Sequence, residues 1–330
     1  MPADDILKFA SNCYEFDVNT LEYVLSGSNL VYKFQKNRKR FYLRIGERPL
    51  KRILAEIEWM TYLQKEIKTP AVIKSKSGKF AETFNENGKV YSVCVFNELQ
   101  GSFWDKNDES KWNSTTFYNW GKVMGKMHCL TKQYNPGESR ALFVDENYFY
   151  SKNAIKCVPT VYRIMEQIVN EIENLPRDND SYGLIHSDLH QQNFLIGNNE
   201  INVLDFDDCM YGWFALDISI ALYHALWWGV ADGISCRNEF ALTIINNFLK
   251  GYLSQNSLSD FWLAKIYLFM RYRQINVLGW FVKPDNINKI LDINVFNVQY
   301  DVAKNISYIE NGIFFENCKI NEKCFINVSK

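Results

Sequence analysis

The stretch Leu184–Asp208, LIHSDLHQQNFLIGNNEINVLDFDD, contains two histidines, four aspartates and four asparagines within 25 residues. Two apolar runs, FLI and INVL, separate these polar groups, and both resemble short buried strands in length and composition. The segment Gly197–Glu200 lies between the runs, and Gly and Asn tolerate the positive φ angles of a tight turn. The sequence therefore predicts a β-hairpin folded about residue 199.

A hairpin folded about residue 199 places Asn193 opposite Asp205, because cross-strand partners lie at equal distances from the turn. The two side chains would provide an amide oxygen and a carboxylate, which are ligands that Mg²⁺ prefers. Asp188 lies five residues before Asn193, on the loop that leads into the hairpin. One carboxylate beside two oxygen ligands for a metal is the arrangement that phosphoryl transfer requires.

The string HSDLHQQN at residues 186–193, followed by DFD at 205–207, resembles the catalytic loop and metal-binding motif of the aminoglycoside phosphotransferase/choline kinase family. Members of that family have the protein-kinase-like fold. The D-x-x-x-x-N spacing and a D-F-x-D motif about a dozen residues later are specific in combination, whereas either motif alone would be weak.

This resemblance implies that Asp188 is the catalytic base or the group that orients the acceptor hydroxyl. It implies Asn193 and Asp205 as Mg²⁺ ligands, with Asp207 as a possible third, and ATP as the phosphate donor. Ser187 stands where the family often has glycine, and because serine is also small we expect little consequence.

The segments before residue 100 alternate in the manner of antiparallel strands. The expected strands lie in residues 21–34, 40–46, 79–84 and 89–96, and a short N-terminal helix precedes them. Residues 52–66 have helical spacing of apolar side chains. After the polar segment that begins near residue 97, the apolar residues of the chain mostly have helical spacing. We therefore predict an α+β, two-lobed protein-kinase-like fold: residues 1–99 form a small antiparallel-sheet lobe with one helix that binds nucleotide, and residues 100–330 form a larger, mainly helical catalytic and substrate-binding lobe.

Arg44, in FYLRIG, occupies the position where the family has a basic residue that holds the nucleotide phosphates. The protein-kinase-like fold pairs this residue with a helix glutamate. At about 100° per residue, Glu56 falls within the apolar arc of the predicted helix, whereas Glu58 falls outside it. A carboxylate on a buried face needs a charged partner, so we predict that Glu56 pairs with Arg44.

Two further nucleotide-binding segments are predicted in the first lobe. Ser26, Gly27 and Ser28 lie between the first two strands and are expected to cover the phosphates, although they match neither G-x-G-x-x-G nor the Walker A pattern. The boundary segment VFNELQG is expected to be the hinge, where backbone groups near Asn97 and Leu99 meet the adenine.

The composition limits the partners and the compartment. The net charge is −1 and hydrophobic residues make up 47% of the chain, which is typical of a globular protein without a nucleic-acid-binding surface.

Eight cysteines are scattered without a CxxC pair, which favours free thiols in a reducing compartment. The N-terminus is unlike a signal peptide, and no apolar run reaches about 18 residues. We expect a cytoplasmic monomer or homodimer that acts on a small molecule, with neither nucleic acid nor membrane as a partner.

The predicted activity is an ATP- and Mg²⁺-dependent phosphotransferase, a kinase that acts on a hydroxyl of a small molecule. The acceptor pocket is expected between the Asp188 loop and the C-terminal helices. The candidate lining residues are His190, Trp227, Trp228, Tyr272 and Arg273. Tryptophan faces would suit an ammonium group and an arginine would suit a carboxylate, as in an amino alcohol, a homoserine-like compound or a sugar derivative. Core packing is the alternative role for these residues.

Several other functions remain open. An antibiotic phosphotransferase of the aminoglycoside type would need an acidic cleft, and the acidic residues after Asp217 are sparse. A protein Ser/Thr kinase of the same fold is disfavoured because DCMYGWFALDI leads almost directly into a helix, without an activation-loop segment. H-x-D-x-H at His186, Asp188 and His190 would suit a metallohydrolase, but this leaves Asn193 unexplained. A regulatory nucleotide-binding module without catalysis is the last alternative.

Overall fold

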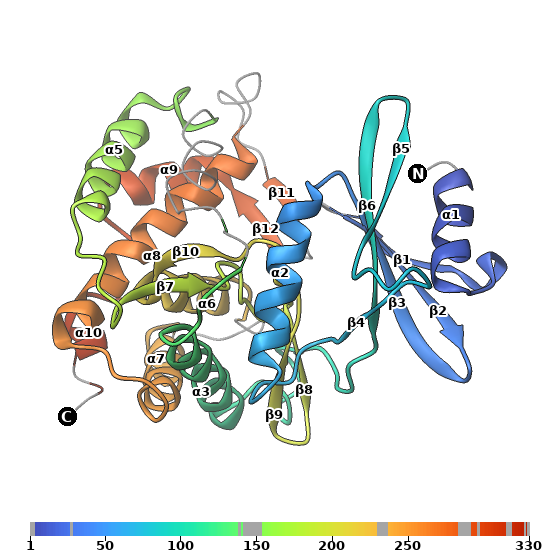
Figure 1. Ribbon diagram of the computed structural model, residues 1–330. Coiled ribbons are helices and arrows are strands. Elements are labelled where there is room, and N and C mark those ends of the chain that lie inside the picture. Colours follow the sequence, from blue (N-terminus) through green and yellow to red (C-terminus); the bar gives the residue numbers. More distant parts are fainter. Residues whose placement is uncertain are drawn as a thin grey trace. The chain divides into compact units, whose positions relative to one another are not determined.

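The computed structural model describes residues 4–26, 29–137, 140, 154–229, 237–282, 292–295, 298–314, 319–326 and 328 (Figure 1). The chain forms two compact units. The first contains Met1–Gly101, Tyr134–Arg140 and Asn202–Asp207, and the second contains Ser102–Gln133, Ala141–Ile201 and Asp208–Lys330.

Two late segments belong to the first unit, which the predicted division into residues 1–99 and 100–330 did not include. Hydrogen bonds explain the placement of the segment Asn202–Asp207. The Asn202 side chain donates to the Gln100 carbonyl, at 2.7 Å, and the Val203 amide donates to the Lys68 carbonyl, at 2.9 Å. The assignment of nucleotide binding to residues 1–99 and of catalysis and substrate binding to residues 100–330 remains a prediction.

The first unit is an antiparallel sheet with helices. Its sheet has the order β1-β2-β3-β6-β4, and β5 pairs with β6. The elements are α1 (Asp4–Tyr14), η1 (Val18–Thr20), β1 (Glu22–Ser26), β2 (Leu30–Lys36), β3 (Lys39–Gly46), α2 (Leu50–Leu63), β4 (Val72–Ile73), β5 (Glu82–Glu86) and β6 (Lys89–Asn97). The strand predicted at residues 79–84 begins instead at Glu82, because the Ser75 amide bonds to the Lys79 carbonyl and closes a turn there.

The sheet of the first unit has two chemically different faces, because successive side chains of a strand point to opposite sides. Leu43 and Ile45 of β3 belong to an apolar cluster with residues of α1. Arg44, between them, pairs in register with Cys94 of β6 and contacts α2. Figure 1 shows α1 and α2 on opposite sides of the sheet. The alternation therefore places one buried cation on the α2 face.

The chain after Gly101 is mainly helical. Its elements are α3 (Ser114–Thr131), α5 (Pro159–Glu173), β7 (Tyr182–Ile185), β8 (Phe194–Gly197), β9 (Glu200–Val203), β10 (Met210–Trp213), α6 (Phe214–Trp228), α7 (Arg237–Leu253), α8 (Asp260–Phe281), β11 (Asp292–Val295), β12 (Val298–Asp301), α9 (Val302–Glu310) and α10 (Lys323–Ile326). β7 pairs with β10, and β8 pairs with β9. This order of a strand-rich part and a helical part agrees with the predicted α+β class.

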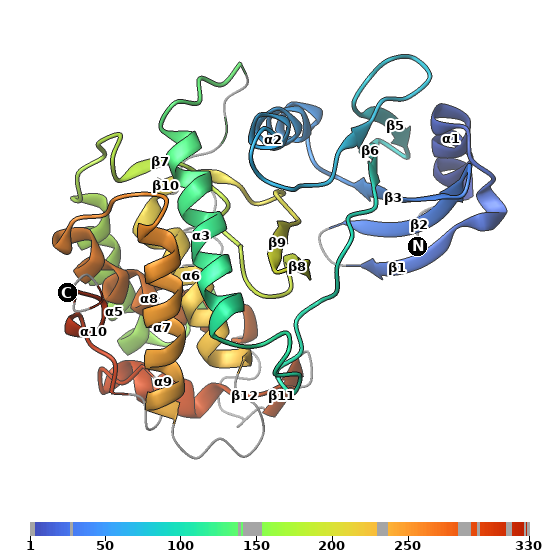
Figure 2. The ribbon, with the colours of Figure 1, turned by 90° about the horizontal axis from the view of Figure 1, so that it is seen from below.

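Helices α3 and α7 pack side by side in the second unit (Figure 2). Two glycines of α3 allow the close approach. A Cβ atom on Gly121 would lie 1.8 Å from the Phe248 carbonyl oxygen, and one on Gly125 would lie 2.5 Å from the Tyr252 carbonyl oxygen. Any larger side chain at either position would force the helices apart.

The hairpin predicted about residue 199 is confirmed by the pairing of β8 with β9. Asn198 and Asn199 both have positive φ angles, of 52° and 58°, as a two-residue turn of this type requires. Asn193 and Asp205 lie just beyond the ends of the paired strands, so their predicted opposition remains a prediction.

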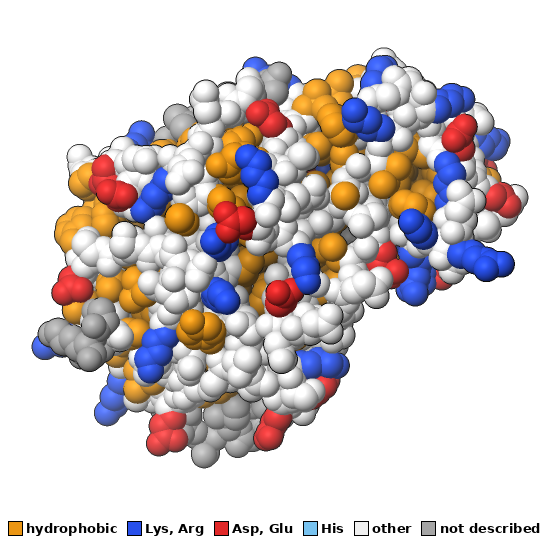
Figure 3. All heavy atoms as spheres, turned by 60° about the horizontal axis from the view of Figure 1, so that its bottom comes forward, with side chains coloured by type: hydrophobic (Ala, Val, Ile, Leu, Met, Phe, Trp, Pro, Cys, Tyr) orange, Lys and Arg blue, Asp and Glu red, His pale blue; other side chains and the backbone are white. Residues whose placement is uncertain are grey.

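Charged side chains of both signs are interspersed on the face drawn in Figure 3, in keeping with the net charge of −1. Among the described helices, none is long and apolar enough to cross a membrane.

Candidate active site

The backbone of the loop before Asp188 is fixed by a buried acid. Asp217, in the first turn of α6, accepts hydrogen bonds from the amides of His186, at 3.0 Å, and Ser187, at 2.8 Å. Ser187 has a φ of 68°, a left-handed conformation that glycine adopts without strain and serine does not. We predicted little consequence of serine in place of glycine because both are small. The positive φ shows a second difference, because serine is less stable than glycine in this backbone conformation.

The Asp188 carboxylate is surrounded by donors of the second unit, and its side chain is 24% exposed. Arg273 Nη2 lies 2.8 Å from Oδ1. His190 Nε2 lies 3.3 Å and Asn193 Nδ2 lies 3.1 Å from Oδ2. Burial alone would raise the pKa of Asp188, but His190 and Arg273 outweigh it and hold that pKa well below its ordinary value. The group therefore stays ionised and is able to accept a hydrogen bond from a hydroxyl.

Asn193 is oriented by the same loop. Its Nδ2 donates to the Asp188 carbonyl, at 2.8 Å, as well as to the Asp188 carboxylate. Because the amide nitrogen is directed toward Asp188, the amide oxygen is on the other side of the group and suits a hard cation. These contacts fit the predicted role of Asn193 as a metal ligand.

Arg273 is a buried partner of Asp188. Its side chain is 4% exposed. Its Nε and Nη2 donate to His224 Nε2 at 3.0 and 2.8 Å, and its guanidinium lies 4.7 Å from the Trp280 ring centroid. Burial, together with the cationic Arg273, lowers the pKa of His224 well below its ordinary value, so His224 is a neutral acceptor. Through these contacts Arg273 supports Asp188, and its predicted role in binding a substrate carboxylate remains a prediction.

We expect Arg273→Gln to lower kcat by about 10- to 100-fold, because a misplaced catalytic group costs that much. Arg273 lowers the pKa of Asp188, so its loss raises that pKa. Asp188 then becomes protonated at a higher pH, so the acidic limb of the plot of kcat/KM against pH shifts to higher pH. Arg163→Gln, on an exposed position of α5, is the matched control. An unchanged profile in Arg273→Gln would contradict the assignment.

The structure brings most of the predicted acceptor-site residues together. His190 packs edge-on against Trp228, with ring centroids 5.2 Å apart, and Trp227 and Trp228 lie 4.9 Å apart. Both tryptophans also contact His224. Tyr272 is 2% exposed, which favours core packing, the alternative considered for it.

In the first unit, Arg44 and Glu56 form the predicted ion pair. Nη1 and Nη2 of Arg44 lie 2.8 and 2.7 Å from the two Glu56 oxygens, and the side chains are 10% and 2% exposed. Burial opposes the charged form, but the Glu56 carboxylate raises the pKa of Arg44 above its ordinary value. The Phe96 ring lies 5.0 Å from the guanidinium. The role of this pair in nucleotide binding remains a prediction.

Glu56→Gln should lower the free energy of unfolding by about 3 kcal/mol, because it leaves Arg44 as a buried and uncompensated charge. Chemical denaturation measures this difference. Glu58→Gln is the control on the same helix, since its side chain is less buried than that of Glu56. The double variant Arg44→Met/Glu56→Leu should recover much of the stability, and equal losses in the single and double variants would contradict this account.

Asp205 and Asp207 have different surroundings in the first unit. Asp205 is exposed and has a φ of 56°. Asp207 is 4% exposed, and its Oδ2 accepts from Asn29 Nδ2 at 2.6 Å and lies 2.8 Å from Arg48 Nη2. These partners favour an organising role for Asp207 over direct ligation of a metal, so Asp205 is the stronger candidate ligand of the two.

The predicted phosphate-covering loop lies largely outside the described residues. Gly27 and Ser28 are not described, and of Ser26 only the backbone, at the end of β1, is described. At the predicted hinge, the Asn97 amide donates to the Ala71 carbonyl and the Glu98 amide donates to the Arg40 carbonyl. The amide of Asn97 is therefore occupied within the sheet region, and Leu99 is the remaining predicted contact for the adenine.

The metallohydrolase alternative finds no support. Among the described residues, no group of three or more His, Cys, Asp or Glu side chains could hold a metal ion. His186 Nδ1 accepts from the Asp188 amide at 3.4 Å, whereas His190 faces the Asp188 carboxylate.

Three residues near the Asp188 loop were not predicted as part of the site: His128, His224 and Trp280. His128 Nε2 lies 3.0 Å from Asp217 Oδ2. Each lies within a predicted helix and far along the sequence from Asp188. The one available signal was a histidine within an otherwise apolar helical pattern, since a buried imidazole needs a partner.

Comparison with known proteins places the chain in a family. The family described as phosphotransferase enzyme family, APH, matches residues 22–245. Amicoumacin kinase of Bacillus subtilis (strain 168) is 32% identical over 299 residues, which are 87% of each chain.

Solved structures agree with this similarity and with the predicted protein-kinase-like fold. An amicoumacin kinase in complex with AMP-PNP, Ca²⁺ and Ami aligns with a TM-score of 0.86 and 27% identity, over 98% of this chain and 97% of that one. A microcompartment-associated aminopropanol kinase aligns with a TM-score of 0.72 and 19% identity, over 93% and 94% of the two chains. The chain is therefore a kinase that belongs to the APH phosphotransferase enzyme family.

Proposed function

We propose that this kinase transfers the γ-phosphate of ATP, in the presence of Mg²⁺, to a hydroxyl group of a small molecule. The observation that carries the proposal is the Asp188 carboxylate, held ionised by Arg273 and bonded to Asn193 in one loop. The relative solved with AMP-PNP and Ca²⁺ supports a nucleotide and a divalent cation as cofactors.

In this mechanism Asp188 accepts a hydrogen bond from the acceptor hydroxyl and orients its oxygen toward the γ-phosphorus. The depressed pKa makes Asp188 a weak base, so the proton leaves the hydroxyl late, as in a loose phosphoryl-transfer transition state. Asn193 and Asp205 would hold the cation, which neutralises phosphate charge when bound. Arg44, oriented by Glu56, would contact the nucleotide phosphates.

The acceptor is proposed to be a small alcohol. The sequence indicates amino alcohols, homoserine-like compounds and sugars as acceptor classes, and the bond of Arg273 to Asp188 favours the homoserine-like class less than the others. The second candidate is an antibiotic-type phosphotransferase, with amicoumacin as the first compound to test, because the 32% identical relative is named for it. The aromatic side chains of Trp227 and Trp228 near His190 support an acceptor with an apolar or cationic face.

A panel of hydroxyl compounds tests the proposal. Each compound is incubated with the enzyme, ATP and Mg²⁺, ADP release is measured, and the phosphorylated product is identified by mass spectrometry. We expect one class to give a product with a mass increase of one phosphoryl group. Phosphorylation of a protein substrate in preference to every small alcohol would overturn the proposal and favour a protein kinase.

A further inference from the structure

A chain of buried hydrogen bonds leads from the loop before Asp188 toward a cavity at the end of α3 and α7. Asp217 accepts from the amides of His186 and Ser187 and from His128 Nε2. His128 Nδ1 lies 2.9 Å from the Tyr252 hydroxyl, which accepts from Asn256 Nδ2 at 2.9 Å. All of these groups belong to the second unit.

The direction of this chain is fixed by its first donor. The Asn256 amide nitrogen can only donate, so the Tyr252 oxygen accepts from it and turns its own proton toward His128 Nδ1. His128 Nε2 then carries the imidazole proton and donates to Asp217. Burial lowers the pKa of His128, in keeping with a neutral imidazole. Each group in the chain therefore depends on the orientation of the group before it.

The close packing of α3 on α7 brings His128 of α3 within hydrogen-bonding distance of Tyr252 of α7. Gly125 of α3 lies against the backbone of Tyr252, and His128 follows Gly125 by less than one helical turn. The rings of His128 and Tyr252 meet edge-on, with centroids 5.5 Å apart.

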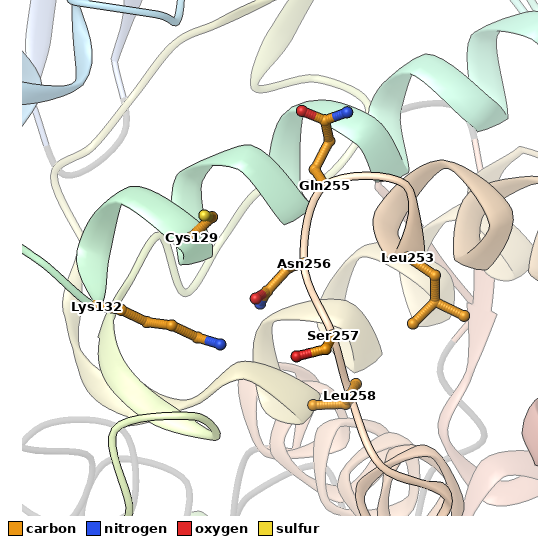
Figure 4. Close-up of a pocket in the computed structure, with 7 residues that line it drawn as sticks. All are labelled: Cys129, Lys132, Leu253, Gln255, Asn256, Ser257 and Leu258. Carbon is orange, nitrogen blue, oxygen red and sulfur yellow. The ribbon is translucent and has the colours of Figure 1, made fainter.

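The other end of this series of hydrogen bonds reaches an open surface cavity with a volume of about 560 Å³. Its wall includes Cys129, Lys132, Asn256, Ser257 and Leu258 (Figure 4). This volume lies within the range of about 300–1,000 Å³ that is usual for small-molecule sites. Asn256 is 8% exposed and is both the first donor of the chain and part of the cavity wall.

We propose that this cavity is a second ligand site, for a small anionic metabolite with a carboxylate or phosphate group, and that its occupancy reaches the phosphotransfer loop through Asn256, Tyr252, His128 and Asp217. The importance of this coupling for phosphoryl transfer rests on the proposed function.

Lys132 is the group that selects an anion. Its ammonium lies 3.1 Å from Asp180 Oδ1, but the Asp180 side chain is 87% exposed, and such surface pairs contribute little. The Lys132 side chain itself is 15% exposed, so its charge is partly shielded from water. Figure 4 shows Lys132 extending toward Ser257, beside the amide of Asn256. An anion there can exchange for Asp180, while a polar group of the same ligand bonds to Asn256.

The Asn256 amide nitrogen has two N–H groups, and a ligand oxygen that accepts from the one bonded to Tyr252 competes with that hydrogen bond. In a buried chain each hydrogen bond polarises the next, so the loss of the first bond weakens the hold of His128 on Asp217. The amides of His186 and Ser187 are then bound less firmly. The differential contact with Asn256 is what allows the ligand to shift the loop.

Charged labels on Cys129 test this proposal. Cys13, Cys157, Cys236, Cys318 and Cys324 are first replaced by serine, while the buried Cys94 and Cys209 are kept. Cys129 is then modified with methanethiosulfonate reagents that attach an anionic sulfonatoethyl, a cationic aminoethyl or a neutral methyl group. Hydrogen–deuterium exchange of the amides of residues 184–190 is measured by mass spectrometry, so the readout needs no acceptor substrate.

We expect the anionic label to accelerate exchange of residues 184–190 by about threefold or more, with a smaller effect of the other labels. The Tyr252→Phe variant interrupts the chain and should abolish this response, while Cys129→Ser shows that the response needs the label. Unchanged exchange at full labelling, or equal responses to all three labels, would overturn the site. An equal response in Tyr252→Phe would overturn the route. Inorganic phosphate and acetate, added to unlabelled enzyme with AMP-PNP and Mg²⁺ present, then distinguish the two ligand sources.

Discussion

Asp188→Asn should lower kcat by about 10²- to 10⁴-fold and leave nucleotide affinity nearly unchanged. The amide is isosteric with the carboxylate but carries no charge and accepts only through one oxygen. The acceptor hydroxyl then loses the group that orients it and receives its proton. Steady-state kinetics with the acceptor found in the panel measure kcat, and fluorescence titration with a nucleotide analogue measures affinity.

The matched control for this variant is Glu171→Gln, also an acid-to-amide change. Glu171 is half-exposed and pairs with Lys265 on the surface, so its loss should change neither kcat nor stability appreciably. Thermal unfolding of both variants separates catalysis from folding. A kcat for Asp188→Asn within about threefold of the wild type would remove Asp188 from the chemistry.

Asp205→Asn should lower kcat by about 10³-fold and raise the Mg²⁺ concentration required for half-maximal activity. Asparagine is the appropriate replacement because Asp205 has a φ of 56°, and Asn tolerates this conformation better than Ala. A loss of activity then reports the missing charge and not backbone strain. Activity is titrated with Mg²⁺ at saturating ATP.

Asp208→Asn provides the comparison for Asp205, because Asp208 is exposed and lies three residues further along the chain. It should retain normal activity and normal Mg²⁺ dependence. Should Asp205→Asn show the same Mg²⁺ dependence as the wild type, the assignment of Asp205 as a metal ligand would fail, even if kcat fell for another reason.

The predictable parts of the fold and of the candidate site depend on local patterns. The turn at Asn198 and Asn199 was predictable because positive φ angles restrict the residue types. The partner of Arg44 was predictable because Glu56, unlike Glu58, lies on the apolar face of its helix, and a buried carboxylate requires a cation. Both inferences use spacings of a few residues within one element or between neighbours.

The unpredictable parts depend on contacts between distant helices. Arg273 and His224 lie 49 residues apart and are bonded to each other, Arg273 also contacts Asp188, and His128 reaches Asp217 across 89 residues. Helical periodicity gives the face on which a residue lies but not the neighbouring helix that it meets. The sequence therefore indicated Arg273 as a residue near the site but could not predict its bond to Asp188.

The alternation along β3 has a consequence for the choice among competing strand alignments. A shift of β3 by one residue against its neighbours would place the Arg44 guanidinium in the apolar cluster that packs against α1. It would also place Leu43 next to the Glu56 carboxylate. Both charges would then be buried without a partner of opposite charge, so the shifted strand register would be much less stable than the observed one. Arg44, which we expect to contact the nucleotide phosphates, therefore also helps to specify the register of the sheet to which it belongs.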